Sequence, residues 1–452
     1  MTRHLLSALY VLTLLLHAGL AQPAETRATV AADVGERVSD LESLTVQARR
    51  INDFVYKIDG QGALFLVNTS AGAVLIDTGN GGEQSARQKT LVEELASGPI
   101  VKIIATHAHS DHVAGLPAWR QEIEAGTELV AHQRYGYMAR LQREAMPRLK
   151  QRFHVLYPRL VDLADKSYEQ YWSIEPTRLV YPGSDYRFEL GGVRFEVIAP
   201  ENTGEGEDGL LVWLPGQGIL FTGDMFGPLY PMFPNLYTVR GEKMRDALDY
   251  VAALDQILAL EPHLLLPSHF GVIEGRDTIR ASVTRMRDAV QYVWDQTLTG
   301  MNAGKSLWQV MDEVQLPEQL RVSEGHGKVS WGVRAIWETV LGWYDYDTVA
   351  NLYAVPPSAV HADLLELAGG AGPVAVRARR HLDAGRPLEA LRLLDVARDS
   401  ANRMVLETRI ATLEDLLRRA RAGARNHSEI GLLEADLRAT GQALDELGSS
   451  SS

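Results

Sequence analysis

A short segment, Thr106-His107-Ala108-His109-Ser110-Asp111-His112, has the residue types and the spacing of a metal site. It places three of the chain's 13 histidines and one aspartate directly after an apolar run. His107 and His109 are two positions apart, so in an extended loop both imidazoles point to the same side, while Asp111 and His112 can face a second ion. Imidazole and carboxylate ligands suit Zn²⁺, and secondarily Mn²⁺ or Fe²⁺. A polar loop of surface histidines is the alternative, but composition alone rarely produces this order.

Two further candidate ligands end apolar runs later in the chain. Asp224 follows the run at 219–222 and Gly223, and His269 ends the run at 264–268. A carboxylate beside a buried strand is costly unless it is paired or bound to a metal. Both residues are therefore predicted to face the histidine loop.

A third group of acidic residues lies between these two parts of the sequence. Glu205, Glu207 and Asp208 form a cluster in which any of the three could coordinate a metal, and a solvated acidic turn is the alternative. Asp77, which ends the run at 73–76, is predicted to orient the histidine loop through hydrogen bonds rather than to bind metal itself.

The elements that must position these residues alternate between strands and helices. Short apolar runs broken by Gly, Asn and Ser predict strands at 54–56, 63–67, 73–76 and 100–105, with a helix at 83–96. The pattern returns with strands at 186–190, 193–198, 210–214, 219–222 and 264–266, and a helix at 243–258. The sequence therefore contains two stretches of strands and helices, each with candidate ligands at strand ends. This arrangement predicts an α/β fold of the αββα sandwich type, with the site along one edge.

Two other stretches are predicted to be mainly helical. Residues 120–180 show no recognisable chemistry and could form a cover over the site. Beyond 275, Ala, Leu and Arg recur at helical spacing, notably at 360–368 and 372–394, so a helical domain for packing or dimerisation is expected.

Length and composition set the remaining limits. The 452 residues suit two or three domains, predicted as a signal peptide at 1–21, a catalytic domain at 45–275, a helical domain at 276–425 and a tail at 426–452. An uncleaved N-terminal anchor is the alternative for the first segment. The net charge of −13 argues against nucleic acid as a partner, and the absence of cysteine excludes thiolate chemistry. The expected location is the periplasm or the exterior, without stable membrane insertion once the signal is removed.

Read with Asp77, Asp224 and His269, the His-x-His-x-Asp-His loop resembles the signature of the metallo-β-lactamase superfamily. Several further segments are similar to the linear alkylsulfatase branch of that superfamily. They are Gly204-Glu205, Asp208, 210–215, 235–241, 295–297, Ser330, Gly342-Trp343, Asp345 and Pro356-Pro357. The later segments fall in what that family uses as its helical dimerisation domain, which implies a homodimer formed through this domain.

The resemblance also implies site residues and a cofactor. Its ligand set for two Zn²⁺ ions comprises His107, His109 and Glu205 for the first ion, Asp111, His112 and His269 for the second, and Asp224 as the bridge. Asn235 and Arg240 match the asparagine and arginine that hold the sulfate oxygens in that family. A small anionic ester is therefore the expected substrate.

Two departures from the alkylsulfatase pattern bear on the substrate. The bridging residue of that family is glutamate, whereas Asp224 is the shorter aspartate common elsewhere in the superfamily. The sequence also ends after the helical segment, without the sterol-carrier-like domain of the enzymes that act on detergents, so a long-chain substrate is not expected.

The sequence thus predicts an exported dizinc hydrolase that cleaves sulfate esters through a metal-bound hydroxide. A hydrolase of a lactam, lactone or phosphoester on the same scaffold is the nearest alternative, because fold does not settle function. A non-catalytic scaffold protein with a decayed metal site is a third, which the complete ligand set disfavours.

Overall fold

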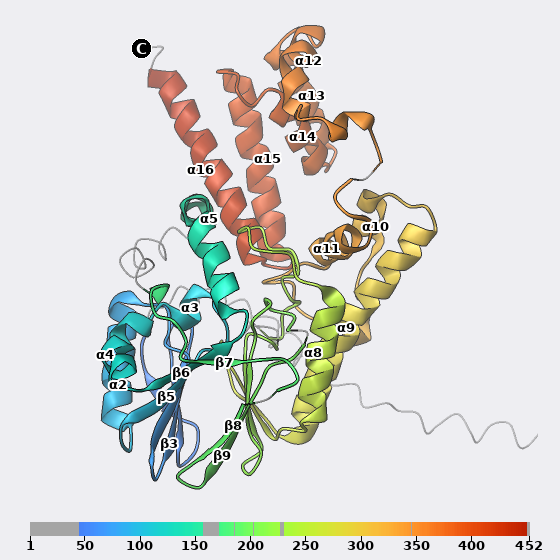
Figure 1. Ribbon diagram of the computed structural model, residues 1–452. Helices are drawn as coiled ribbons and strands as arrows, with labels where there is room; N and C mark the ends of the chain where they lie inside the picture. The colour runs from blue at the N-terminus through green and yellow to red at the C-terminus, as the bar shows by residue number, and fades with distance from the viewer. Residues whose placement is uncertain are drawn as a thin grey trace, which may run out of the picture.

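The structure is a computed structural model that describes residues 45–156, 171–184, 186–201, 203–226, 230–344 and 346–449. The predicted signal peptide at 1–21 and the end of the predicted tail at 450–452 lie outside these residues. Two β-sheets face each other in the lower half of Figure 1, and helices occupy the upper half.

The first sheet has seven strands in sequence order. They are β1 (Ala48–Arg50), β2 (Val55–Ile58), β3 (Leu64–Thr69), β4 (Gly72–Ile76), β5 (Ile100–Ile104), β6 (Glu128–His132) and β7 (Arg178–Val180). Strands β1 to β4 are antiparallel, whereas β4 to β7 run parallel, with helix α2 (Gly82–Leu95) connecting β4 to β5. The parallel strands bring the residues after β4 and β5 to the same edge of the sheet.

The second sheet has six strands in the order β13-β12-β11-β10-β9-β8. They are β8 (Tyr186–Leu190), β9 (Val193–Ile198), β10 (Leu211–Leu214), β11 (Ile219–Gly223), β12 (Leu264–Pro267) and β13 (Ile273–Glu274). Only β11 and β12 are parallel neighbours, and helix α8 (Ala247–Ala259) connects them. Asp224 and His269 therefore follow two parallel strands at one edge.

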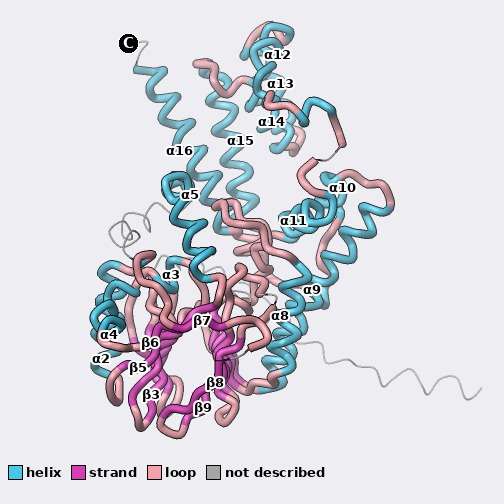
Figure 2. The backbone as a smooth tube through the Cα atoms, in the orientation of Figure 1, coloured by secondary structure: helices cyan, strands magenta, loops and turns pink. Residues whose placement is uncertain are grey.

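Buried side chains of both sheets meet in a shared core. The strands of the two sheets face each other in Figure 2. Phe65 of β3 and Phe221 of β11 pack edge to face with ring centroids 5.2 Å apart, and Val74, Val197 and Leu266 belong to the same apolar cluster. Helix α2 packs outside the first sheet, with α3 (Ser110–Val113), the 3-10 helix η1 (Leu116–Trp119) and α4 (Arg120–Glu124) nearby. Helix, sheet, sheet and helix form four layers, which confirms the predicted αββα sandwich.

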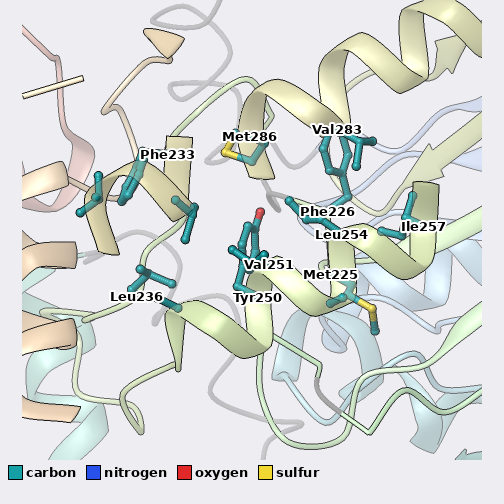
Figure 3. Packing of buried hydrophobic residues seen from close by; sticks show 14 of the residues in the cluster. Met225, Phe226, Phe233, Leu236, Tyr250, Val251, Leu254, Ile257, Val283 and Met286 are labelled. Atoms are coloured by element: carbon teal, nitrogen blue, oxygen red, sulfur yellow. The ribbon is translucent and has the colours of Figure 1, made fainter. Parts of the chain in front are cut away.

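Helix α9 (Arg276–Asn302) packs against α8 on the outer face of the second sheet. Figure 3 shows Val283 and Met286 of α9 beside Tyr250 and Leu254 of α8. The same cluster continues into α10 (Leu307–Glu313) and α11 (Val329–Leu341). The first helices after 275 thus share a core with the sandwich, and the domain boundary at 275 remains a prediction.

The remaining helices form an extension beyond the sandwich (Figure 1). They are α12 (His361–Leu367), α13 (Ala371–Asp383), α14 (Pro387–Val396), α15 (Arg403–Ala422) and α16 (His427–Ser449), with 3-10 turns η2 (Glu318–Leu320), η3 (Val349–Leu352) and η4 (Pro357–Val360) before them. The tail predicted from residue 426 is wrong for 427–449, because α16 pairs with α15 there and reaches α5 (Tyr135–Leu156).

The prediction of a mainly helical stretch at 120–180 is correct for α4 and α5 and misses β6 and β7. The run Glu128–His132 holds four consecutive buried residues between two helices, of which three are apolar, and so short an apolar run shows no clear periodicity. Pairing with β5 decides its conformation.

Glu128 at the start of β6 joins four strands through hydrogen bonds. Its carboxylate accepts from Lys102 of β5, from Arg178 Nε of β7 at 2.9 Å and from the Tyr186 hydroxyl of β8 at 2.8 Å. Burial favours the neutral acid, but these donors outweigh it and lower the pKa of Glu128 to about 2. The charged carboxylate therefore links the two sheets.

We expect Glu128→Gln to lower the free energy of unfolding by about 1–2 kcal/mol at neutral pH. Because the native pKa lies below the ordinary value of 4.5, this contribution is complete above about pH 4.5 and fades as the pH falls toward 2. Urea titrations of both proteins at pH 7 and near pH 3 measure it. Glu144→Gln, which breaks an exposed pair with Arg140, is the control and should leave the free energy of unfolding almost unchanged. An equal deficit at both pH values would contradict the assignment.

No helix within the described ranges combines the length and the apolar character needed to cross a lipid bilayer.

Candidate metal centre

Four strand ends deliver the predicted site residues to one edge of the sandwich. Asp77 follows β4, the histidine loop follows β5, Asp224 follows β11 and His269 lies just after β12. Gly223 has a φ of 53°, and a Cβ there would lie 2.8 Å from Thr106 Cβ and Oγ1. This glycine therefore allows the strand before Asp224 to approach the histidine loop closely.

All seven predicted ligands lie together in three overlapping groups whose ligand atoms are within 4.8 Å of one another. The groups are His107, His112 and Asp224; Asp111, His112 and His269; and His109, Glu205 and Asp224. All but Asp111 are buried. Because two groups share Asp224 and two share His112, the three groups form one continuous cluster.

The spacing within the cluster is that of ligands around a common ion. Asp224 Oδ2 lies 3.4 Å from Nε2 of both His112 and His269 and 3.8 Å from His107 Nε2. His269 Nε2 also lies 3.4 Å from Asp111 Oδ2. Ligand atoms on a tetrahedral zinc with bonds of about 2.0–2.1 Å are roughly 3.3 Å apart. The donor set and its spacing therefore fit a divalent metal.

Several buried polar atoms of the cluster have no hydrogen-bond partner among the described residues. They are His112 Nε2, Glu205 Oε2 and Asp224 Oδ1. A buried polar atom without a partner costs about 1–3 kcal/mol, and more when it carries charge. Coordination of a cation is the simplest way to satisfy such atoms within a cluster of candidate ligands.

Asp77 determines which ring nitrogen of His107 and of His112 carries the proton. One of its oxygens accepts from the Thr106 backbone N–H at 2.8 Å, and the other accepts from the Thr106 hydroxyl and from His112 Nδ1, both at 2.9 Å. Thr106 Oγ1 in turn accepts from His107 Nδ1 at 3.0 Å. Because carboxylates only accept, Nδ1 of His112 carries the proton and, through the Thr106 hydroxyl, so does Nδ1 of His107. Their Nε2 atoms face the cluster, where His107 Nε2 also lies 2.9 Å from His109 Nδ1.

Protonation in the cluster reflects burial and crowded charge. Burial lowers the pKa of His109 to about 4, so this imidazole is neutral at pH 7, as a ligand must be. Burial also opposes charge on His269, but Asp224 and Asp111 outweigh it and raise its pKa to about 9. A bound cation would replace the proton that these carboxylates otherwise attract.

The acidic turn at 205–208 presents three carboxylates in three different surroundings. Glu205 is buried, with Oε1 3.7 Å from His109 Nδ1 and 2.6 Å from Arg245 Nη2, and burial raises its pKa to about 8 although Arg245 opposes the rise. Glu207 pairs instead with Arg134 and Lys243. Asp208 accepts from the Ala108 N–H at 2.8 Å, which braces the histidine loop. Glu205 is thus the member of the turn that faces the cluster.

The predicted sulfate-binding residues lie beside the cluster. Asn235 is buried, and its Oδ1 has no hydrogen-bond partner within the part of the chain that the structure describes. Arg240 donates from Nε and Nη2 to the two carboxylate oxygens of Glu242, at 2.6 and 2.8 Å. Arg245 donates to Glu242 Oε2 at 3.1 Å and to the Asn235 carbonyl at 3.0 Å. Two arginines and two carboxylates, Glu205 and Glu242, therefore meet at this side of the site.

Three residues near the site were missed by the sequence analysis, namely Glu242, Arg245 and His326. The last comes from a Gly-His-Gly segment before α11, where Gly327 donates to the Phe233 carbonyl at 3.1 Å and Asn426 Nδ2 donates to the His326 carbonyl at 2.9 Å. Burial first, and then Arg240 and Arg245, hold the pKa of His326 well below its usual range. The glycines on both sides of His326 were the available signal.

Comparison with known protein families accounts for most of the described fold. Residues 58–269 match the model of the metallo-beta-lactamase superfamily, and residues 307–428 match the alkyl sulfatase dimerisation family. The two matches follow one another in the order of the sandwich and the helical extension.

Curated relatives show the same arrangement. The chain is 26% identical over 340 residues to a linear primary-alkylsulfatase of Pseudomonas sp., an alignment that covers 69% of this chain and 62% of the relative. The chain is a homologue of the alkylsulfatases. An alkyl/aryl-sulfatase of Saccharomyces cerevisiae is 26% identical over 74% of this chain and 55% of its own length. The chain therefore spans a little more than half of the length of these alkylsulfatases.

A solved structure supports the fold of this alkylsulfatase homologue. The stereoselective inverting sec-alkylsulfatase from Pseudomonas sp. superposes with a TM-score of 0.75 at 22% identity, over 89% of this chain and 66% of the other. The sandwich and the helical extension are therefore shared as one architecture.

Proposed function

We propose that this protein is an exported dizinc hydrolase of sulfate esters, with a short-chain alkyl sulfate as the simplest substrate. The observation that carries the proposal is the convergence of seven candidate ligand side chains near Arg240 and Arg245, which both donate to Glu242. Homology to alkylsulfatases supports the choice of ester. Export rests on the signal-like sequence at 1–21, which predicts a periplasmic or secreted protein.

Two divalent ions bound by the cluster would supply a hydroxide nucleophile at neutral pH and neutralise negative charge on the ester. The protein's own residues would orient the ligands and bind the substrate. Asp77 and Thr106 hold His107 and His112 with their Nε2 lone pairs toward the cluster. Arg240, with Asn235 beside it, would hold the anionic head, since a guanidinium binds an oxyanion through two parallel hydrogen bonds.

We also propose a homodimer formed through the helical extension. Residues 307–428 match a dimerisation family. Apolar side chains gather on the solvent side of the segment between α11 and the end of α12, where a second copy would cover them. These exposed residues are Leu341, Trp343, Tyr346, Val349, Leu352, Tyr353 and Leu367.

The substrate test compares purified, zinc-loaded protein on a short alkyl sulfate, a lactone, a cephalosporin and a phosphodiester. We expect sulfate release to dominate. Arg240→Ala should lower kcat/KM for the alkyl sulfate by about 10–100-fold, because one charge-assisted bidentate contact is lost. Arg187→Ala, which removes an exposed arginine of β8, should leave kcat/KM within about twofold of the parent.

An uncharged ester is the second candidate substrate, and the Glu242 carboxylate favours it because Arg240 is already neutralised. Preferential cleavage of the lactone or cephalosporin, with no effect of Arg240→Ala, would reject the sulfatase proposal and leave only a metal-dependent hydrolase.

A further inference from the structure

The carboxylate of Glu242 occupies the part of Arg240 best suited to bind an oxyanion. Nε and Nη2 of a guanidinium form a planar fork that matches two oxygens of a carboxylate or of a sulfate equally well. Both donors point to Glu242, at 2.6 and 2.8 Å. The side chains of Arg240 and Glu242 are each less than one-fifth exposed, so this pair is shielded from solvent.

Glu242 also contacts other side chains of the site. Its Oε2 lies 3.8 Å from Nε2 of His109 and 3.1 Å from Nη2 of Arg245. An anionic group on Arg240 therefore lies directly beside the metal cluster.

Arg240 is already neutralised without a substrate. Its guanidinium is opposed by the Glu242 carboxylate, so it offers no surplus positive charge to an incoming anion. Arg245 keeps its 2.6 Å pair with Glu205 even if Glu242 moves. Movement of Glu242 would therefore release Nε and Nη2 of Arg240 from its carboxylate.

The backbone around Glu242 suits movement of the side chain alone. The N–H groups of Gly241 and Glu242 both donate to Thr238 Oγ1, at 3.3 and 3.2 Å, which anchors the loop. Rotation about the side-chain bonds of Glu242 would free the fork of Arg240 without unfolding this turn.

We propose that Glu242 is a specificity-determining residue that acts as an internal ligand of Arg240, and that the anionic head of the substrate must displace it. The inference rests on the proposed function for the nature of the substrate. It predicts that free inorganic sulfate, which lacks an alkyl group to add binding energy, binds weakly and inhibits little. Glu242 thus selects against small oxyanions.

The test is calorimetric titration of inorganic sulfate into the zinc-loaded full chain. We expect Glu242→Ala and Glu242→Gln to bind sulfate at least about tenfold more tightly than the parent protein, because the competing charge is gone. The added affinity should disappear in the double variant Arg240→Ala/Glu242→Ala. Glu207→Gln is the matched control, since it removes a nearby negative charge that pairs with Arg134 and Lys243 and not with Arg240.

Metal content is measured for every variant, and Glu242→Gln preserves the shape of the side chain should the alanine variant lose metal. Unchanged or weaker sulfate binding by a fully loaded Glu242 variant would overturn the proposal. So would a gain that persists without Arg240, or one that Glu207→Gln reproduces. Hydrolysis of the alkyl sulfate is assayed separately, so tighter sulfate binding without sulfatase activity would reject the proposed function while leaving the role of Glu242 intact.

Discussion

Replacing Asp224 by alanine is expected to leave fewer than two metal ions per chain and to lower kcat/KM by about a thousandfold or more, equivalent to roughly 4 kcal/mol. Asp224 belongs to two of the three ligand groups, and its Oδ2 faces the Nε2 atoms of His107, His112 and His269 within 3.8 Å. The other two carboxylates of the cluster, those of Asp111 and Glu205, each belong to only one of the three ligand groups. Without it, two imidazole-rich sites remain with no shared anion between them.

Metal analysis of the purified variant, together with initial rates on the preferred ester, measures both effects. Asp208→Asn is the matched control, because Asp208 is also a buried aspartate near the histidine loop but faces the Ala108 N–H. The asparagine can still accept that hydrogen bond, so we expect the full metal content. An Asp224→Ala protein that keeps two ions and its rate would refute the bridging role, and metal loss from Asp208→Asn would move the ligand assignment within the acidic turn.

The histidine loop was predictable because its ligands are close in sequence. Spacing alone places His107 and His109 on one side, and the apolar strand before them fixes where the loop begins. Asp224 and His269 were also predictable, since each follows a strand that is buried throughout. A polar or charged side chain there is costly unless it is paired or bound to a metal. These inferences need only local sequence and the rule that strand ends share an edge.

Glu242 and Arg245 could not be found in this way. They lie in the run Gly241-Glu242-Lys243-Met244-Arg245, whose composition is that of a solvated loop. Only the tertiary structure buries them, by packing this loop against Glu205 and Asn235. His326 was missed for a related reason, because a segment more than 50 residues beyond the last ligand is brought back by contacts with Phe233 and Asn426. Residues that support a site through long-range contacts leave little local pattern.

Asp77→Asn is expected to weaken zinc binding by about 10–100-fold while changing no atom that touches the metal. An asparagine can accept from the Thr106 N–H through its oxygen, but its amide nitrogen then faces the Thr106 hydroxyl and His112 Nδ1 and must donate to them. His112 would have to accept at Nδ1 and carry its proton on Nε2, the atom that faces Asp224 and Asp111. The wrong nitrogen would then be free.

Competition titrations with a zinc chelator measure the change in affinity, and NMR of the histidine ring nitrogens reports the tautomer directly. Ser268→Ala is the control, because Ser268 donates a longer hydrogen bond of 3.3 Å to the same Asp77 oxygen, and its loss leaves the carboxylate an acceptor for His112. We expect that variant to bind zinc within about threefold of the parent. Asp77 also has a left-handed backbone with a φ of 62°, a strained conformation that the hydrogen bonds to its carboxylate stabilise. If Asp77→Asn weakens zinc binding but leaves His112 protonated at Nδ1, the residue acts by stabilising this turn and not by selecting the tautomer.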